Sequence, residues 1–272
     1  MQNAKAFEQF LVLLGLQNIT VQGYLGSVRR FTGIVGEDPD EETVKKFVYE
    51  LYISDYSYSH KTNTVLGIEK YMSFLNRPIR LGRQKKPKQI IKDTLTEAEV
   101  TKLIFNCKNI REKAIVTLLA YSGIRNRELC NLKVKDIDFG RNQITVLQGK
   151  GLKDSKCEVS SECIQILLDY LNVYQKTSED YLFTTIVRNN QYHPCDLRKL
   201  IHVLGKRMGI EKRIYPHLLR HSLSVNLLLR GANIFVIQKQ LRHTLIETTF
   251  TYLNSIALTM RNDYEKYAPS YV

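Results

Sequence analysis

A short segment near residue 217 places an imidazole and a guanidinium within one helical turn of each other. The run Pro216-His217-Leu218-Leu219-Arg220 begins with a proline, which is favoured at the first position of a helix. Residues three apart in a helix share a face, so His217 and Arg220 would point the same way from the helix start. The pair would unite a group that exchanges protons near neutral pH with a group that holds anionic oxygens.

Two further segments carry residues that could join this pair. Arg125 follows a helical segment that ends at Ser122-Gly123, and Glu128 lies three residues after it. Farther along, Leu241-Arg242-His243 is followed by Tyr252, nine residues past the histidine. None of these residues is informative alone, because an arginine near a helix end is more often a surface residue and the chain has 16 tyrosines.

The elements that precede these residues are predicted to be helical. Apolar residues recur at helical spacing in four stretches of the first 76 residues, and we expect Thr20 to be the N-cap of the second. Residues 1–77 are therefore predicted to form a four-helix domain. Between residues 78 and 92 the pattern stops and acidic residues are lacking, which indicates a basic linker. It is either a solvated hinge or a strap that lies along DNA phosphates through Arg80, Arg83, Lys85, Lys86 and Lys88.

Residues 93–272 are predicted to form a second domain. Thr96 and Glu99 have the spacing of a capping box, and later helices are expected at 111–121, 162–174, 195–208, 216–230 and 234–241. Two short strands, 143–146 and 156–159, flank a turn that carries Lys150 and Lys153, which predicts a hairpin with lysines at its tip. The predicted fold class is mainly α with a small antiparallel β-sheet.

The balance of charge narrows the class of partner. The chain has 272 residues, with 40 lysines and arginines against 27 acidic residues, and a formal net charge of +13. This excess favours a polyanionic partner, with nucleic acid ahead of an anionic membrane. No apolar stretch reaches the roughly 20 residues that span a bilayer, and residues 1–16 lack a signal-peptide pattern, so we expect no membrane contact and a cytoplasmic protein.

Taken together and in order, these residues resemble the pattern of the tyrosine recombinase (integrase) family. That pattern runs Arg, Lys in a β-hairpin, His-x-x-Arg, His or Trp, and Tyr nine residues later. The matching segments are AYSGIRNREL (120–129), Gly149-Lys150-Gly151, HLLRHS (217–222) and Leu241 through Tyr252. Arg242 departs from the pattern, because the family commonly has Gly there. Either the backbone at this position does not need a positive φ, or Arg242 adds a phosphate contact.

The resemblance implies an enzyme whose two domains close around duplex DNA as a clamp. Tyr252 would attack phosphorus and form a 3′-phosphotyrosyl link, which keeps a phosphoester for rejoining without ATP. Arg125 and Arg220 would hold the non-bridging oxygens, and Lys150, or its rival Lys153, would protonate the departing 5′ oxygen. The other catalytic candidates are His217, as proton acceptor or donor, and His243, as a hydrogen-bond partner of a phosphate oxygen. Glu128 would orient Arg125 or cap its helix.

The resemblance further implies site-specific recombination by four protomers on two duplexes, with a monomer or dimer in the absence of DNA. The length suits either the simple Xer-like type, which resolves chromosome or plasmid dimers, or a compact integrase of a mobile element. A type IB topoisomerase and a non-catalytic helix-turn-helix regulator are the more remote alternatives. No cofactor or metal is expected. His217, His221 and His243 lack carboxylate or thiolate partners at ligand spacing, and the neighbouring arginines would repel a divalent cation.

Overall fold

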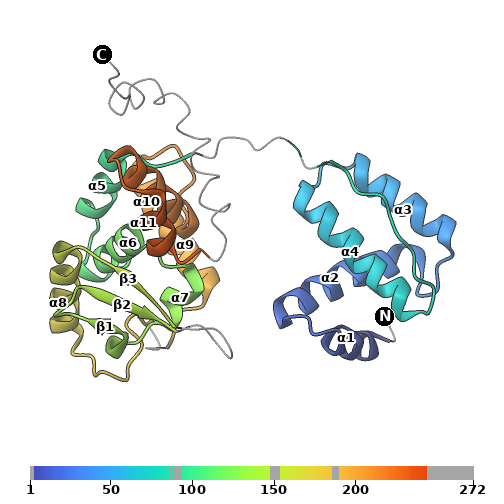
Figure 1. Ribbon diagram of the computed structural model, residues 1–272, viewed down its shortest axis with the longest axis horizontal. Coiled ribbons are helices and arrows are strands. Elements are labelled where there is room, and N and C mark those ends of the chain that lie inside the picture. The colour runs from blue at the N-terminus through green and yellow to red at the C-terminus, as the bar shows by residue number, and fades with distance from the viewer. Residues whose placement is uncertain (1–2, 86, 88–92, 148–153, 186–189, 244–272) are drawn as a thin grey trace, which may run out of the picture. The chain divides into compact units, whose positions relative to one another are not determined.

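The structure is a computed structural model of the full chain, and it describes residues 3–85, 87, 93–147, 154–185 and 190–243. Its elements gather in two compact units, residues 1–90 and 91–272 (Figure 1). Each unit has a hydrophobic core of its own. The described elements are mostly helices, with one three-stranded antiparallel sheet in the second unit. This arrangement confirms the predicted fold class.

The described part of the first unit, residues 3–85 and 87, contains four helices. They are α1 (Ala4–Leu13), α2 (Asn18–Val35), α3 (Glu41–Ile53) and α4 (Tyr58–Phe74). Their apolar faces meet in a core that includes Phe7, Phe31 and Tyr71. The rings of Phe7 and Tyr71 pack edge to face with their centroids 5.2 Å apart. The apolar spacing in the sequence therefore identified all four helices of this unit.

Helix starts in this unit depend on local hydrogen bonds. Asp40 begins α3 by accepting a hydrogen bond from the Thr43 N–H at 2.7 Å. The prediction that Thr20 caps α2 is wrong, because α2 begins at Asn18. The Thr20 N–H bonds the carbonyl of Gln17 at 2.8 Å, so Thr20 already lies inside the first turn. Gln17 is the N-cap and makes no side-chain cap hydrogen bond, so the sequence carries no capping signal at that position.

Part of the segment assigned to the linker packs against the first unit. Ile79 and Leu81 join the apolar cluster of this unit, and the Leu81 N–H donates to Glu69 Oε1 at 2.9 Å. Arg83 forms an ion pair with the other carboxylate oxygen of Glu69 at 3.1 Å. The apolar residues alternate here, so a search for helical spacing passes over them. Of the remaining basic residues, Arg80 and Lys85 are exposed, and Lys86 and Lys88 lie outside the described residues.

The second unit is organised around α6 (Ile110–Ser122). Ten of its 13 residues are buried, because α5 (Glu97–Phe105), α8 (Ser161–Tyr174) and α10 (Pro216–Leu229) pack against it. The predicted capping box is present at the start of α5, where Thr96 and Glu99 exchange hydrogen bonds. The short α7 (Asn126–Asn131) follows α6, and α9 (Pro194–Arg207) packs against it (Figure 1).

The sheet has the strand order β1-β2-β3 and is antiparallel throughout. The 3-10 turn Val134–Asp136 leads into β1 (Ile137–Asp138), which pairs with β2 (Gln143–Val146). In turn, β2 pairs with β3 (Ser155–Glu158), one residue earlier than predicted. No sequence pattern predicted β1, which is only two residues long. Residues 148–153 of the hairpin, with Lys150 and Lys153, lie outside the described residues.

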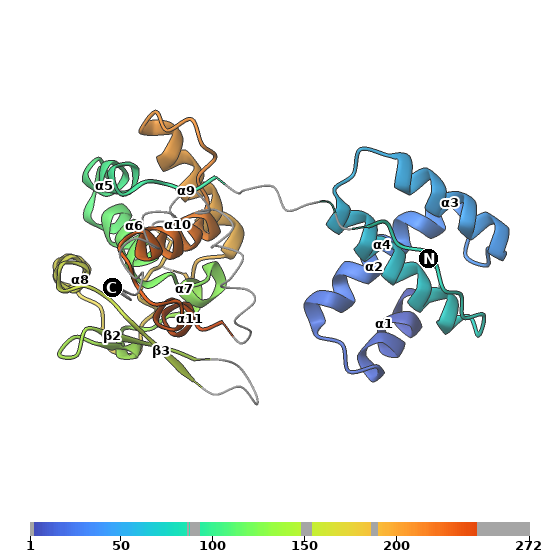
Figure 2. The ribbon, with the colours of Figure 1, turned by 45° about the horizontal axis from the view of Figure 1, so that its top comes forward.

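The last described helix, α11 (Ile234–Leu241), occupies the predicted residues. It packs against α10 and runs beside β3 (Figure 2). Within the described ranges, no helix is both long and apolar enough to cross a membrane. The end of α11 thus lies beside the strand that closes the hairpin and near the end of α6.

Candidate active site

Arg125 is placed by the way in which α6 ends. Gly123 leaves α6 with φ of 61°, and a Cβ at this position would lie 2.7 Å from a Leu241 methyl carbon and 3.0 Å from a Leu223 methyl carbon. Glycine meets both demands, since it adopts positive φ at little cost and has no side chain. The chain then turns so that Arg125 becomes the N-cap residue of α7, with 44% of its side chain exposed.

Glu128 holds Arg125 at two points, and so both caps α7 and orients the guanidinium. Its Oε2 accepts the Arg125 backbone N–H at 2.7 Å, and its Oε1 accepts a hydrogen bond from Arg125 Nη1 at 2.6 Å. Burial raises the pKa of the Glu128 carboxyl, but the charge of Arg242 and the hydrogen bonds from Arg125 outweigh burial and hold this pKa below its ordinary value. Glu128 is therefore an anion at neutral pH.

Arg242 binds the same carboxylate from the end of α11. Its Nη2 lies 2.7 Å from Glu128 Oε2, and 3% of its side chain is exposed. The backbone has φ of 55°, in the left-handed region that favours glycine. The first alternative considered for Arg242 is therefore wrong, because the position does have a positive φ. The guanidinium is buried against Glu128 in the structure, and its contact with a DNA phosphate stays a prediction.

Arg220 is buried where α6, α10 and α11 meet. It is 1% exposed, and its guanidinium donates to the carbonyl oxygens of Gly123 and Leu241. A buried guanidinium needs such partners, and they fix the direction in which the planar group points. Pro216 opens α10 at its first position, as predicted, and places the exposed His217 one turn before Arg220.

His243 lies among the positive charges of this region. Burial lowers its pKa most, and the charges of Arg220, Arg125, His217 and Arg242 lower it further, to about 4. Contacts place these residues in one region, because Arg220 bonds the carbonyl of Leu241, two residues before His243, and Arg125 and Arg242 share the carboxylate of Glu128. The structure thus brings together four of the six predicted catalytic residues. The neutral imidazole can both donate and accept a hydrogen bond at pH 7.

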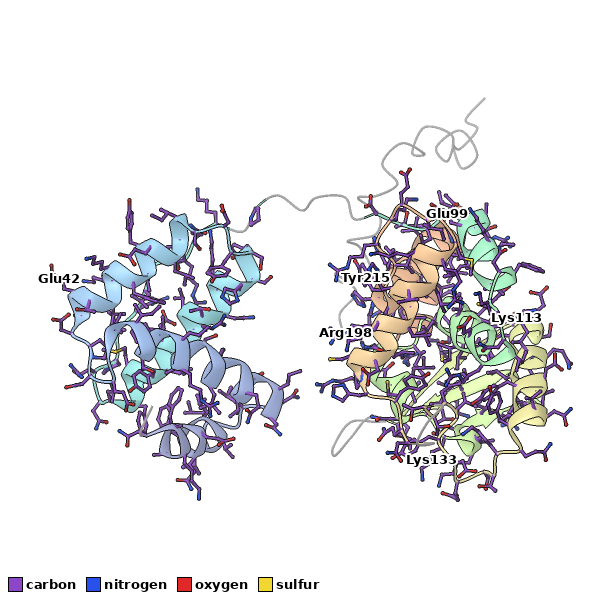
Figure 3. The ribbon with its side chains drawn as sticks, turned by 180° about the vertical axis from the view of Figure 1, so that it is seen from behind. Glu42, Glu99, Lys113, Lys133, Arg198 and Tyr215 are labelled. Carbon is purple, nitrogen blue, oxygen red and sulfur yellow. The ribbon has the colours of Figure 1, made fainter. Side chains whose placement is uncertain are left out.

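The other two predicted catalytic residues, Lys150 and Tyr252, lie outside the described residues, as does Lys153. In the part of the chain that the structure describes, no group of three or more His, Cys, Asp or Glu side chains is placed to hold a metal ion. Tyr215, directly before α10, lies at the same edge of the second unit as Arg198 of α9, and Lys113 of α6 lies at the opposite edge (Figure 3). The start of α10 and Arg198 of α9 therefore share one edge.

Two glutamines that the sequence analysis did not identify complete the surroundings of the cluster. Gln240 bonds the backbone of Glu158 in β3 and the carbonyls at the end of α6. Gln238 donates to the His243 carbonyl at 3.2 Å. The partners of Gln240 lie between 82 and 119 residues away in the sequence, so no local pattern could have indicated these contacts.

Comparison with known proteins identifies the family. The family model described as the phage integrase family matches residues 93–257, more than half of the chain. Tyrosine recombinase XerA of Pyrococcus horikoshii is 31% identical over 264 residues, which cover 96% of this chain and 91% of that protein. A crystal structure of XerA recombinase matches at 28% identity with a TM-score of 0.60, and the match covers all of both chains.

A structure of the XerH site-specific recombinase bound to a palindromic difH substrate, in a post-cleavage complex, has a TM-score of 0.72. The match covers 90% of this chain and 80% of that chain at 18% identity, which is a likeness of fold alone. The matches to XerA extend through both units rather than a single motif, and they confirm the resemblance seen in the sequence. This chain belongs to the phage integrase family and is a Xer-like tyrosine site-specific recombinase.

Proposed function

We propose that this recombinase exchanges strands at a specific site in duplex DNA and that it resolves chromosome or plasmid dimers. The observation that carries the proposal is the cluster of Arg125, His217, Arg220 and His243, which the contacts of Glu128 and of the Arg220 guanidinium hold in one region of the second unit. Forked guanidinium groups bind the paired non-bridging oxygens of a phosphate diester, and two of them suit its two oxygens. The cluster therefore fits a scissile phosphate of the DNA backbone.

The two arginines would stabilise the phosphorane-like transition state. Arg125 is held by Glu128 and Arg220 by two carbonyls, so neither group must reorganise as negative charge develops on the phosphate oxygens. By analogy with arginine fingers, such a group is worth roughly 10³–10⁵ in rate. His243 would donate a hydrogen bond to a non-bridging oxygen, and His217 would exchange a proton during the step.

Tyr252 would be the nucleophile and Lys150 the general acid. The phenolate forms a bond to phosphorus while the bond to the 5′ oxygen breaks, and the lysine ammonium gives its proton to that leaving oxygen. A free phenol has a pKa of about 10, so the positive charge of the cluster would help to form the phenolate. The 5′ hydroxyl of the partner strand then reverses the step. Neither ATP nor a divalent metal is needed, because the cluster supplies the charge that Mg²⁺ would bring.

The Xer-like role is supported by similarity to XerA proteins over nearly their whole length. Duplex DNA is the proposed partner, in keeping with the net charge of +13. Exchange of all four strands between two duplexes requires four nucleophiles, so we propose a homotetramer in the synaptic complex and a monomer or dimer without DNA. The alternative, a compact integrase of a mobile element, would use the same chemistry on different sites.

The chemistry can be tested on duplexes that the full chain selects from a random-sequence pool. A nicked suicide duplex of the selected sequence should trap a covalent adduct with the wild type and with Tyr264→Phe, each in the presence of chelator. Tyr252→Phe should still bind this duplex but form no adduct. An adduct with Tyr252→Phe would reassign the nucleophile, and loss of cleavage in chelator would overturn the metal-free reaction.

The biological role can be tested with plasmids. A plasmid with two directly repeated copies of the selected sequence should be resolved into two circles. Relaxation of supercoils without pairing of sites would instead indicate a topoisomerase. A selected sequence that matches the ends of a mobile element, rather than a single chromosomal site, would favour the integrase role.

A further inference from the structure

The side chain of Gln240 lies where three elements of the second unit meet. It projects from the last turn of α11, and its Oε1 accepts the Glu158 N–H of β3 at 3.0 Å. Its Nε2 donates to the Glu158 carbonyl at 2.7 Å and lies 3.3 Å and 3.4 Å from the carbonyl oxygens of Tyr121 and Ser122. One amide thus joins α11, β3 and the end of α6.

The contact with Glu158 uses backbone groups that the sheet leaves unpaired. In the β2–β3 ladder the Val159 N–H donates to the Asn142 carbonyl, and residues 143 and 158 form the next pair. Hydrogen-bonded and non-hydrogen-bonded pairs alternate in an antiparallel ladder, so the N–H and C=O of Glu158 face away from β2. The amide of Gln240 occupies the place that a further strand would take at this edge.

The contacts with Tyr121 and Ser122 give hydrogen-bond donors to the end of α6. We call this meeting point of α6, β3 and α11 at Gln240 the junction. The last carbonyls of a helix have no intrahelical partner and need a donor from elsewhere. The chain leaves this end of α6 through Gly123 and reaches Arg125 two residues later. It leaves α11 through Arg242 and reaches His243, and it enters β3 five residues after Lys150. The junction therefore lies at the base of three segments that carry proposed catalytic residues.

We propose that Gln240 is a positioning residue of this recombinase. Its amide fixes β3, the strand that closes the Lys150 hairpin, against the ends of α6 and α11, and so sets the hairpin in register with Arg125 and His243. The inference rests on the proposed role of Lys150 as general acid. Glu158 is exposed, so water can replace the amide at β3 when it is removed. Loss of Gln240 therefore frees the edge of β3 and leaves the core of the unit in place.

The first test measures the junction itself in the full chain without DNA. In Gln240→Leu, a substitution of similar size, the amide hydrogens of residues 154–159 should exchange at least about 10-fold faster than in the wild type. Those of α6 should exchange at an unchanged rate. The matched control is Gln165→Leu, because Gln165 is exposed on α8 and its side chain bonds Asp169 of the same helix. Unchanged exchange at residues 154–159 would overturn the proposal. If Gln240→Leu does not fold, Gln240→Met provides the same measurement.

The second test uses the selected nicked duplex with either oxygen or sulfur at the 5′ bridging position. A thiolate leaves without a proton, so it bypasses the general acid. Gln240→Leu should cleave the oxygen duplex at least about 10-fold more slowly than the wild type, and sulfur should restore most of the rate. Gln165→Leu should match the wild type on both duplexes. A Gln240→Leu variant that is equally slow on both duplexes, or slow on neither, would contradict a role in placing the hairpin.

Lys150→Ala separates this inference from the function on which it rests. If sulfur rescues both Lys150→Ala and Gln240→Leu, both proposals stand. If sulfur fails to rescue Lys150→Ala but rescues Lys153→Ala, the general acid is Lys153, and the same hairpin is still the element that Gln240 places. If sulfur rescues neither lysine variant, the general acid lies elsewhere and the catalytic part of the inference fails with it, whatever the exchange data show.

Discussion

Arg242 and Glu128 form a buried ion pair that a glycine at position 242 would remove. Breaking such a pair by deleting one partner costs roughly 3–5 kcal/mol, whereas relief of the left-handed backbone returns roughly 1–2 kcal/mol. The loss of the ion pair is the larger effect. We expect Arg242→Gly to lower the free energy of unfolding of the second unit by about 2 kcal/mol at pH 7. Urea unfolding of the full chain, fitted with separate transitions for the two units, measures the change.

The pH dependence of the stability loss in Arg242→Gly distinguishes the contribution of the ion pair from that of side-chain packing. The folded-state pKa of Glu128 lies below its ordinary value of 4.5, so the pair stabilises the fold fully above pH 4.5 and loses this effect as pH falls through the folded-state pKa. The deficit of Arg242→Gly should therefore be complete at pH 7 and shrink or reverse near pH 3. A deficit that stays constant from pH 7 to pH 3 would show that lost packing, not charge, is responsible.

The turn after α6 gives a second prediction. Gly123→Ala should destabilise the second unit by about 2–4 kcal/mol, because the left-handed backbone and the contacts with Leu241 and Leu223 both penalise a Cβ. Gly209→Ala is the matched control, with a similar φ of 63° and nothing within 4 Å of the added carbon. It should lose only about 1–2 kcal/mol in the same urea measurement. Equal losses of unfolding free energy in the two variants would mean that the close packing at Gly123 does not contribute to stability.

Local chemistry explains which elements the sequence could predict. The residues of α11 and the end of α6 at Gly123 were predicted from apolar spacing and from a glycine stop, and α5 from its capping box. The six-residue α7 and the two-residue β1 are too short to show any period. The prediction of Thr20 as an N-cap was wrong because α2 starts without a side-chain cap. Signals within a few residues of one another are reliable here, and short elements carry too few of them.

In the candidate site, too, the sequence predicted some features and not others. The order of Arg125, His217, Arg220 and His243 was readable, and the structure brings these residues together. The contacts that hold these side chains in place could not be predicted from the sequence. Arg242 meets Glu128 across 114 residues, and the Arg220 guanidinium meets the Gly123 carbonyl across 97. Such pairs follow from the packing of α6, α10 and α11, which composition and spacing do not specify.

The basic segment between the units carries a third prediction. Neutralising Lys85, Lys86 and Lys88 to Gln should reduce the slope of log binding constant against log salt by up to about 2–3, since each phosphate contact contributes about 0.9. Preference for the selected sequence over random DNA should remain, because phosphate contacts carry no base readout. As a control, Lys133 and Lys135 both pair with Glu179, so their replacement by Gln should leave the slope unchanged. An unchanged slope in the triple variant would make the segment a hinge.

The last prediction concerns the whole assembly and the segment after Tyr252, which lies outside the described residues. Ile256, Met260, Tyr264 and Tyr267 recur there at spacings of four, four and three before Pro269. An apolar stripe at helical spacing must be buried against something, either its own unit or a neighbouring protomer. In the family, the terminal helix often docks into a neighbour, which would couple the position of Tyr252 to assembly and let only part of a tetramer cleave at one time.

A chain truncated after Asn254 tests this coupling, because it keeps Tyr252 and lacks the stripe. It should bind a single selected half-site with unchanged affinity, whereas cooperative binding of two protomers and plasmid resolution should fall at least about 10-fold. Replacing Ile256 and Met260 by Ser in the full chain should have the same effect without changing its length. Band-shift titrations on one and on two half-sites measure the single-site affinity and the cooperativity. Unfolding of the truncated chain, or loss of its single-site binding, would place the stripe in its own core, because a segment that docks only between protomers contributes nothing to one protomer alone.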